Sequence, residues 1–267
     1  MKPTAKIIAV LVLTGLLGGC SEHKPVTANK AAVTVIKPQA QAKRKMYYTP
    51  PPKLPGEWLV EDILQTYGPY AAHKLDPYFA KAKVSYPPRE VILIALKQEK
   101  KLELWARDNG EFRFIRDYYI MAASGVAGPK LRQGDRQVPE GVYRIVELNP
   151  NSHYHLSMKI NYPNDFDRLH AWREGRANPG SDIFIHGKAV SIGCLAMGDA
   201  AIEELFVLAA QVGAENVKVV IAPRDPRIYP LGTGALGLPE WTPALYALIS
   251  REIKALSPAA KPAKTGL

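Results

Sequence analysis

The sequence predicts a mainly β domain with a few helices, built like a β-sandwich, behind an N-terminal segment of different character. Short runs rich in β-branched and aromatic residues recur along the middle of the chain, and turn-forming Gly, Pro, Asn and Asp separate them. A parallel crossover sheet requires helices that alternate with the strands. Here the segments with helical spacing are few and do not alternate with these runs. The 267 residues are 47% hydrophobic and 22% charged, which excludes wholesale disorder and a polytopic membrane protein.

The excess of basic residues that gives the formal net charge of +10 lies outside the predicted domain. Residues 21–55 contain seven basic side chains and one acid, and residues 1–20 and 256–267 add two lysines each, so residues 56–255 are balanced. A nucleic-acid-binding domain concentrates its excess positive charge where it meets phosphate. The charge distribution therefore predicts no nucleic-acid partner.

The N-terminus has the pattern of a secretory signal. Two lysines precede an apolar run over residues 7–17, which is too short to span a bilayer, and the segment ends at Cys20 after two glycines. This ending resembles a bacterial lipoprotein box, which implies a signal peptide over residues 1–19 and a lipidated Cys20. Ordinary cleavage, with Cys20 an incidental thiol, is the alternative. The same resemblance implies the outer rather than the inner membrane, because Ser21 and not an aspartate follows Cys20. We therefore expect an exported, periplasmic, lipid-anchored protein.

Two segments precede the predicted catalytic region. Residues 20–55 are rich in Lys, Ala, Pro, Thr and Gln and cannot bury enough apolar surface to fold, so they predict a flexible cationic tether. Residues 56–88 form a short helical lead-in, because Trp58, Ile63 and neighbouring apolar residues predict a helix over residues 57–70.

The remaining elements follow in order along the chain. Alternating or apolar runs predict strands at residues 91–96, 102–106, 112–121, 142–148, 154–160, 182–186 and 217–222. A helix from Asp199 to about Val212, with one apolar side, should pack on the sheet behind the loop at Gly193. Residues 223–267 form a C-terminal extension that begins rich in Pro and Gly and contains one closing helix near residues 241–253.

Cysteine usage identifies a candidate nucleophile. If Cys20 belongs to the processed N-terminus, Cys194 stands alone in an oxidising compartment. A buried apolar cysteine is the plain alternative. However, Cys194 follows Gly193 directly, and His186 stands eight residues earlier at the end of a predicted strand. A tight loop between them lets the imidazole reach the thiol, and a thiolate stabilised by an imidazolium is a nucleophile. The amides of Gly193 and Cys194 then face a developing oxyanion.

Residues 89–222 resemble the L,D-transpeptidase catalytic domain of the YkuD type. The resemblance rests on Ile185-His186-Gly187 followed by Ser191-Ile192-Gly193-Cys194, on the upstream stretch 134–143 and on the stretch 161–168. It implies that Cys194 attacks the bond between diaminopimelate and D-alanine in a peptidoglycan stem peptide and then passes the acyl group to an amine. It further implies that His186 is the base, that Gly193 with Cys194 forms the oxyanion site, that Ser191 and Gly187 shape it, and that no cofactor is needed.

Two departures from the family pattern leave the acceptor open. Many members have a histidine two positions before the cysteine and an arginine two positions after it, where this chain has Ile192 and Ala196. The sequence is thus similar to the YafK-like branch. A transpeptidase is the leading prediction. A cysteine amidase that hydrolyses peptidoglycan or lipoprotein-to-wall linkages at the same site is the second, and an inactive wall-binding lipoprotein is the third. The oligomeric state is not predicted.

Other polar residues give weaker signals. His153 and His155 alternate like two strand residues, but no third ligand follows at a recognisable spacing, so half-exposed strand histidines are favoured over a metal site. Arg168 is the candidate contact for a substrate carboxylate, because guanidinium binds carboxylate in a bidentate fork, although its ionic neighbours also suit a solvated loop. Tyr162, like Tyr143, either lines a substrate groove or packs the sheet.

Overall fold

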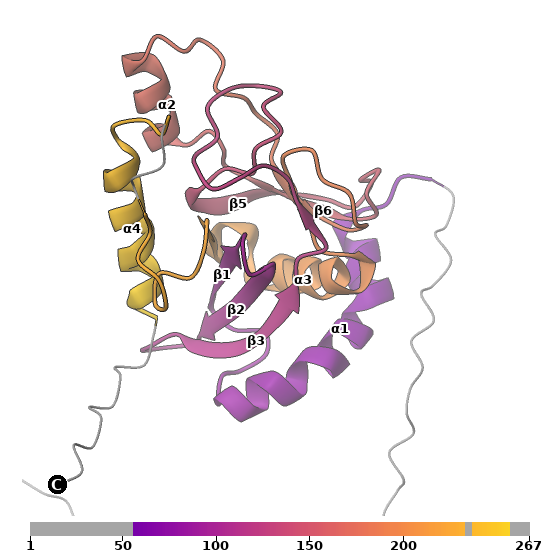
Figure 1. Cartoon of the computed structure of the whole chain (residues 1–267). Coiled ribbons are helices and arrows are strands. Elements are labelled where there is room, and N and C mark those ends of the chain that lie inside the picture. Colours follow the sequence, from indigo (N-terminus) through magenta and orange to yellow (C-terminus); the bar gives the residue numbers. More distant parts are fainter. Residues whose placement is uncertain (1–55, 233–236, 257–267) are drawn as a thin grey trace, which may run out of the picture. The chain divides into compact units, whose positions relative to one another are not determined.

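The computed structural model of the chain describes residues 56–232 and 237–256 (Figure 1). The expected signal peptide, Cys20 and the whole of the expected tether lie outside the described residues. In chain order the helices and strands are α1 Val60–Ala82, β1 Glu90–Leu96, β2 Lys101–Arg107, β3 Arg113–Tyr119, β4 Ala122–Ala123, β5 Gly141–Asn149, β6 Ser157–Ile160, α2 Asp165–Arg173, β7 Phe184–His186, β8 Leu195–Ala196, α3 Asp199–Val212, the 3-10 helix η1 Ala214–Asn216, β9 Val217–Ala222 and α4 Thr242–Lys254.

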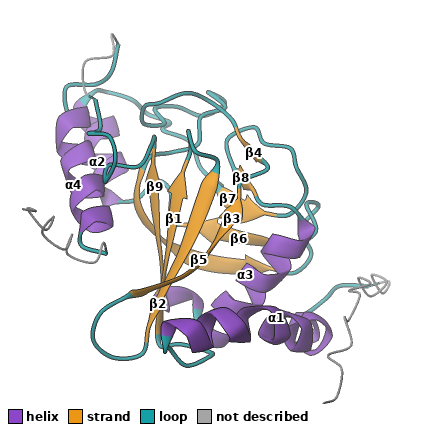
Figure 2. Ribbon diagram, turned by 60° about the horizontal axis from the view of Figure 1, so that its bottom comes forward, coloured by secondary structure: helices purple, strands orange, loops and turns teal. Residues whose placement is uncertain are grey.

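The strands form one bent, mixed sheet in the order β3-β2-β1-β9-β5-β6-β7-β8-β4. Most neighbours are antiparallel, and the pairs β1 with β9 and β7 with β8 are parallel. Figure 2 shows the sheet curving into a half-barrel with helices outside it. The predicted class, a mainly β domain with flanking helices, is confirmed. The expected sandwich takes the form of one sheet that bends rather than two separate sheets.

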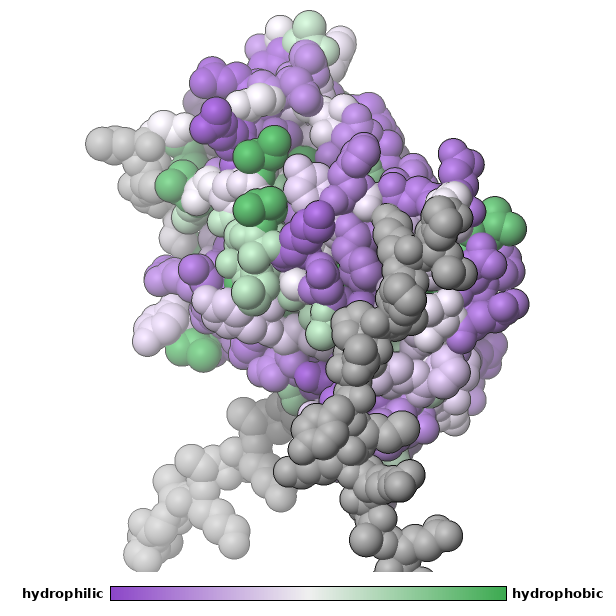
Figure 3. Space-filling model, turned by 90° about the vertical axis from the view of Figure 1, so that its right-hand side faces the viewer, coloured by the Kyte–Doolittle hydropathy of each residue, from purple (hydrophilic) through white to green (hydrophobic). Residues whose placement is uncertain are grey.

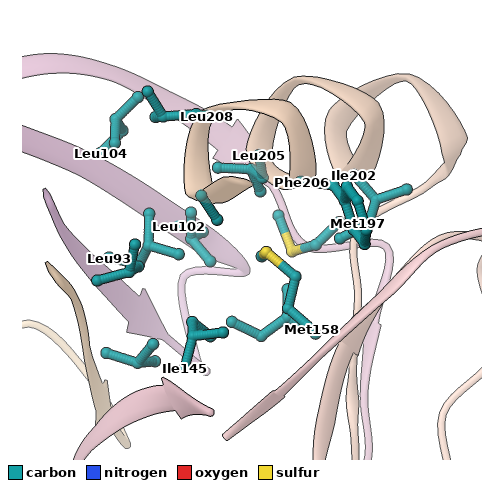
Figure 4. Close-up of a cluster of buried hydrophobic side chains, with 14 of the residues drawn as sticks. Leu93, Leu102, Leu104, Ile145, Met158, Met197, Ile202, Leu205, Phe206 and Leu208 are labelled. Carbon is teal, nitrogen blue, oxygen red and sulfur yellow. The ribbon is translucent and has the colours of Figure 1, made fainter. Parts of the chain in front are cut away.

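Helices cover both faces of the central strands. On one face α1 and α3 enclose the larger apolar cluster, which includes Leu93, Leu102, Met158 and Phe206 (Figure 4). On the other face α4 places Leu245, Ile249 and Ile253 against the sheet. Because β1 and β9 are largely buried on both faces, their sequences are mostly continuous apolar runs, interrupted in β9 by the exposed Lys218.

The helix predicted at residues 199–212 is confirmed with the same bounds. Helix α1 is longer than expected, because Ala71, Leu75 and Phe79 continue its buried face past residue 70. It ends at Lys83, which has a φ of 57° and donates its amide hydrogen to the last turn.

Two expectations need correction. The strand expected from residue 154 begins at Ser157, because the preceding residues form a turn in which His155 has a φ of 77°. The ionic side chains around Arg168, which also suited a solvated loop, belong to helix α2. Asn164 caps this helix by accepting a hydrogen bond from the Asp167 amide at 3.0 Å.

The surface offers no membrane-spanning element among the described residues, since none of their helices is both long and apolar enough to cross a bilayer. The face shown in Figure 3 is largely hydrophilic and is interrupted by small groups of apolar side chains. Scattered apolar groups of this kind are normal on a folded domain.

Candidate active site

The parallel pairing of β7 with β8 brings His186 and Cys194 to one face of the sheet. Ile185 lies opposite Leu195, and His186 lies opposite Ala196. Continuing this register by one residue places Cys194 beside Phe184. Side chains two residues apart on a strand point to the same side, so the Phe184, His186 and Cys194 side chains share a face. The structure therefore brings together the two residues that the sequence singled out, although no hydrogen bond joins them directly.

Both side chains line a cavity of about 540 Å³. Its walls come from the strand end at His186, the turn at Tyr154, the loop before Cys194 and the stretch from Lys130 to Arg136. A volume in this range suits a peptide-sized ligand. A larger hollow of about 800 Å³ lies elsewhere on the described residues, but this cavity is the one that contains the cysteine and the histidine.

His186 is held as a neutral base. The residue is 2% exposed, and its Nδ1 lies 2.6 Å from the carbonyl oxygen of Gly187. A carbonyl oxygen can only accept, so Nδ1 carries the proton and Nε2 keeps its lone pair. Burial lowers the pKa of His186, and the hydrogen bond to Gly187 only partly offsets this. The Tyr154 ring packs beside the imidazole, with the ring centres 4.6 Å apart.

Cys194 is a partly exposed free thiol. Burial raises its pKa, while a backbone hydrogen bond at Phe184 and the positive charge of Lys130 act against the increase and Asp182 adds to it. The sequence-based expectation of a resting thiolate paired with an imidazolium is therefore not what the structure favours. Desolvation of both groups favours the protonated thiol and the neutral imidazole.

Positions 193 and 187 require glycine for two different structural reasons. Gly193 has a φ of 131°, which a residue with a side chain rarely adopts. At Gly187 an added Cβ would lie 2.6 Å from the Tyr154 carbonyl oxygen and 2.7 Å from an Asp199 carboxylate oxygen. No side chain fits at Gly187 without moving the turn that packs against His186.

Ser191 holds the loop that carries Cys194. Its hydroxyl donates to the Cys194 carbonyl oxygen at 2.6 Å and accepts from the Gly193 amide at 3.3 Å. It also accepts from the Ser124 amide at 3.3 Å. In this resting geometry the Gly193 amide points at Ser191, so its expected oxyanion role requires that the 3.3 Å contact be exchanged for the substrate.

The two residues predicted to bind substrate, Arg168 and Tyr162, do not line this cavity. Arg168 is on α2, donates to Asp165 at 2.7 Å and to the Pro163 carbonyl, and does not line the Cys194 cavity. Tyr162 is buried, and its hydroxyl donates to the Pro179 carbonyl at 2.8 Å. Tyr143 is buried beside it, with the ring centres 6.1 Å apart. The tyrosines thus pack the interior of the domain.

His153, His155 and His170 all lie outside the cavity. His153 and His155 lie in a turn rather than a strand, and His155 Nε2 lies 2.8 Å from a Glu203 carboxylate oxygen. His170 on α2 stacks against Trp241, with the ring centres 4.6 Å apart. Within residues 56–232 and 237–256, no group of three or more His, Cys, Asp and Glu side chains is arranged to hold a metal ion.

Sequence reasoning missed Lys130, Arg136 and Tyr154 as cavity residues. Arg136 stands within the stretch 134–143 that carried the family resemblance, so the position was available but its side chain was not singled out. Tyr154 was placed in a strand, and its contact with His186 follows only from the turn.

Comparison with known proteins covers the part of the chain that contains His186 and Cys194. Residues 89–221 match the family model of YkuD, the L,D-transpeptidase catalytic domain. A protein of Escherichia coli (strain K12) named "Putative L,D-transpeptidase YafK" is 38% identical over 138 residues, which are 50% of this chain and 54% of the relative. Its counterpart in Escherichia coli O157:H7 is equally similar. Both findings support the L,D-transpeptidase family for this half of the chain, which spans about half the length of these relatives.

Solved structures show more distant likenesses. The helical cell shape determining protein Pgp2 from Campylobacter jejuni has a TM-score of 0.42 at 21% identity, over 56% of this chain and 55% of that one. L,D-transpeptidase 1 from Mycobacterium tuberculosis has a TM-score of 0.30 at 11% identity, over 50% and 62%. At such identities these likenesses carry no conclusion about function.

Proposed function

We propose that this protein is a cysteine acyltransferase of the L,D-transpeptidase kind that acts on peptidoglycan stem peptides. The observation that carries the proposal is the placement of His186 and Cys194 on one sheet face, lining one cavity. The match of residues 89–221 to the L,D-transpeptidase catalytic domain supports the choice of substrate class.

The reaction begins from the neutral pair. As the Cys194 sulfur attacks the carbonyl carbon of the diaminopimelate residue, His186 Nε2 takes the thiol proton. The tetrahedral intermediate collapses when the carbon–nitrogen bond to D-alanine breaks, and His186 returns the proton to the leaving amine. This leaves a thioester on Cys194. An acceptor amine then attacks the thioester, His186 removes the amine proton, and the thiol is regenerated.

Hydrolysis is a second candidate function, and the residues on either side of Cys194 support it. Ile192 is 73% exposed at the cavity edge and Ala196 is fully buried, so neither supplies a charged group to hold an acceptor amine. If water takes the place of the amine, the same cysteine and histidine act as an amidase.

The test is to incubate the purified protein with stem tetrapeptides and with sacculi, with and without an added amine, and to identify products by mass. A transpeptidase gives amine-linked products, and a hydrolase gives shortened peptides without any added amine. Cys194→Ala should abolish both outcomes, and Cys194→Ser should retain the fold with little activity. If the wild-type protein leaves every substrate unchanged, both enzymatic functions are wrong and the inactive wall-binding lipoprotein replaces them.

The proposal includes an exported, lipid-anchored protein. Its support is the lysine-flanked apolar run and the lipobox-like ending at Cys20, which lie outside the described residues. Cys20→Ser should release the protein from the outer-membrane fraction into the soluble periplasmic fraction. A mature chain that begins elsewhere and takes up no labelled fatty acid would contradict the anchor.

A further inference from the structure

The stretch from Lys130 to Gln137 forms one wall of the Cys194 cavity and folds around a single carboxylate. Asp135 accepts a hydrogen bond from the Lys130 ammonium, and it accepts from three backbone amides at 3.0 Å each, those of Leu131, Arg132 and Gln137. Lys130 also donates to the Arg132 carbonyl oxygen at 3.0 Å. This network fixes the backbone on both sides of Arg136.

Arg136 is held in an unfavourable backbone conformation. Its φ is 54°, in the left-handed region that favours glycine. Across the cavity, Asp182 has a φ of 56°. Residues kept in such conformations are concentrated at binding and catalytic sites, where the position of a side chain outweighs the backbone cost. Arg136 is itself one of the residues that line the cavity.

Arg136 carries the unneutralised charge of the cavity. Lys130 is paired with Asp135, and Asp182 is paired with Lys159 at 2.6 Å. The Arg136 guanidinium is exposed, and among the described residues no carboxylate lies within ion-pair distance of it. The formal charges of the cavity-lining residues and their partners therefore cancel except at Arg136.

We propose that Arg136 forms a carboxylate-binding subsite beside Cys194 and selects substrates that carry a free carboxylate close to the bond that is cleaved. The inference rests on the proposed function, since stem peptides carry carboxylates on their D-glutamate, diaminopimelate and terminal D-alanine residues. A guanidinium binds a carboxylate through two parallel hydrogen bonds, which lysine cannot reproduce. Arg168, already bound to Asp165, takes no part.

The experiment compares stem tetrapeptides in which each of these three carboxylates is amidated in turn. For the wild-type protein, kcat/KM should fall about ten- to hundredfold when the recognised carboxylate is amidated, as for the loss of one charge-assisted hydrogen bond. Arg136→Gln should show a similar loss on the free acid and little further loss on that amide. Arg168→Gln, the matched surface arginine, should discriminate as the wild type does. An Arg136→Gln protein that still discriminates every acid from its amide overturns the inference.

A second measurement tests Arg136 independently of turnover. In a Cys20→Ser chain, Cys194 is the sole thiol, and its alkylation rates with anionic iodoacetate and neutral iodoacetamide are compared. Arg136→Gln should lower the ratio of the iodoacetate rate to the iodoacetamide rate several-fold. Arg136→Lys and Arg168→Gln should leave this ratio near the wild-type value. An unchanged ratio in Arg136→Gln counts against the subsite. Wild-type protein that cleaves no peptide would instead defeat the proposed function, and the ratio would still report on Arg136.

Discussion

At the scale of single residues, the candidate nucleophile and base are both uncharged at rest. Burial raises the pKa of Cys194 and lowers the pKa of His186. The thiol therefore becomes a strong nucleophile only while its proton moves to the imidazole. An arrangement of this kind protects the thiol from indiscriminate alkylation or oxidation, because those reactions need the thiolate.

This arrangement predicts a particular pH dependence. At pH 7, Cys194 should react with iodoacetamide more slowly than a small-molecule thiol does, and its rate should rise until the pH exceeds 9, the ordinary value for this group. Acylation by a peptide should behave differently, because it needs neutral His186, whose lowered pKa keeps the base form present below pH 6.5. Alkylation and acylation rates measured across pH 5–10 test both of these pH dependences. A Cys194 that alkylates fastest near neutral pH would contradict the neutral pair.

Gly187 gives a second residue-scale prediction. Gly187→Ala should destabilise the fold by about 1–3 kcal/mol and abolish most acylation, because the new methyl group displaces the Tyr154 turn and shifts the carbonyl that holds His186. Urea denaturation and acylation rate are the measurements. Gly68→Ala is the matched control: it lies in α1 with nothing within 4 Å of the added Cβ, so its stability should stay the same or rise. Equal effects at the two glycines would refute the packing argument.

At the scale of secondary-structure elements, those with a strong hydrophobic periodicity could be predicted from the sequence. An element defined by local side-chain hydrogen bonds was harder to predict. The apolar runs of β1 and β9 and the one-sided helix α3 were predicted because burial patterns extend over many residues. Helix α2 was missed because its nine residues are mostly polar. Its signal was the cap, in which Asn164 and Asp167 exchange hydrogen bonds of 3.0 Å, a reciprocal pair readable three residues apart in the sequence.

The α2 cap makes stability depend on pH. Burial raises the pKa of Asp167 from 3.8 to about 6, and the neighbouring hydrogen bonds only partly offset this. The protonated carboxyl is favoured in the folded state, so this stabilisation is complete below about pH 4 and is lost as the pH rises through about 6. The difference is at most about 3 kcal/mol, from 1.36 kcal/mol per pKa unit.

Asp167→Asn is the variant that tests this. An amide keeps the acceptor oxygen but cannot ionise, so the variant should be less sensitive to pH between 4.5 and 7.5 than the wild type. Urea midpoints measured at both pH values give the comparison. Asp165→Asn, an exposed position on the same helix, should leave the wild-type slope unchanged. If Asp167→Asn retains that slope as well, another group is responsible for it.

At the scale of the whole molecule, the candidate site depends on contacts that no local pattern contains. The proximity of His186 and Cys194 could be predicted because a short loop joins two strand ends. The part played by Arg136 could not, because it depends on the Asp135 network and on which neighbouring charges are already paired. Arg168 was chosen for its chemistry alone, and helix α2 directs it away from the cavity.

The C-terminal extension is tied to the cavity wall through one buried carboxylate. Tyr246 on α4 donates to Glu140 at 2.8 Å, and the other Glu140 oxygen accepts from Lys97 and from the Gly128 amide, both at 2.9 Å. Lys97 donates to the carbonyl oxygens of Val126 and Val138 as well. These bonds brace the segment from Val126 to Glu140, which contains the wall with Arg136. Residues beyond the family match therefore help to hold the proposed substrate site.

Tyr246→Phe should accordingly destabilise the protein by about 1–2 kcal/mol, because it removes one hydrogen bond to a buried, charged acceptor while preserving the ring that packs in the α4 cluster. The urea midpoint should fall with an unchanged m-value, and KM for a stem peptide should rise more than kcat falls, since the wall moves rather than the nucleophile. Tyr229→Phe, at a side chain that is 58% exposed, serves as the control and should change neither quantity. A Tyr246→Phe protein with wild-type stability would show that Glu140 is sufficiently held by Lys97 and Gly128, and that α4 contributes to the domain through apolar packing alone.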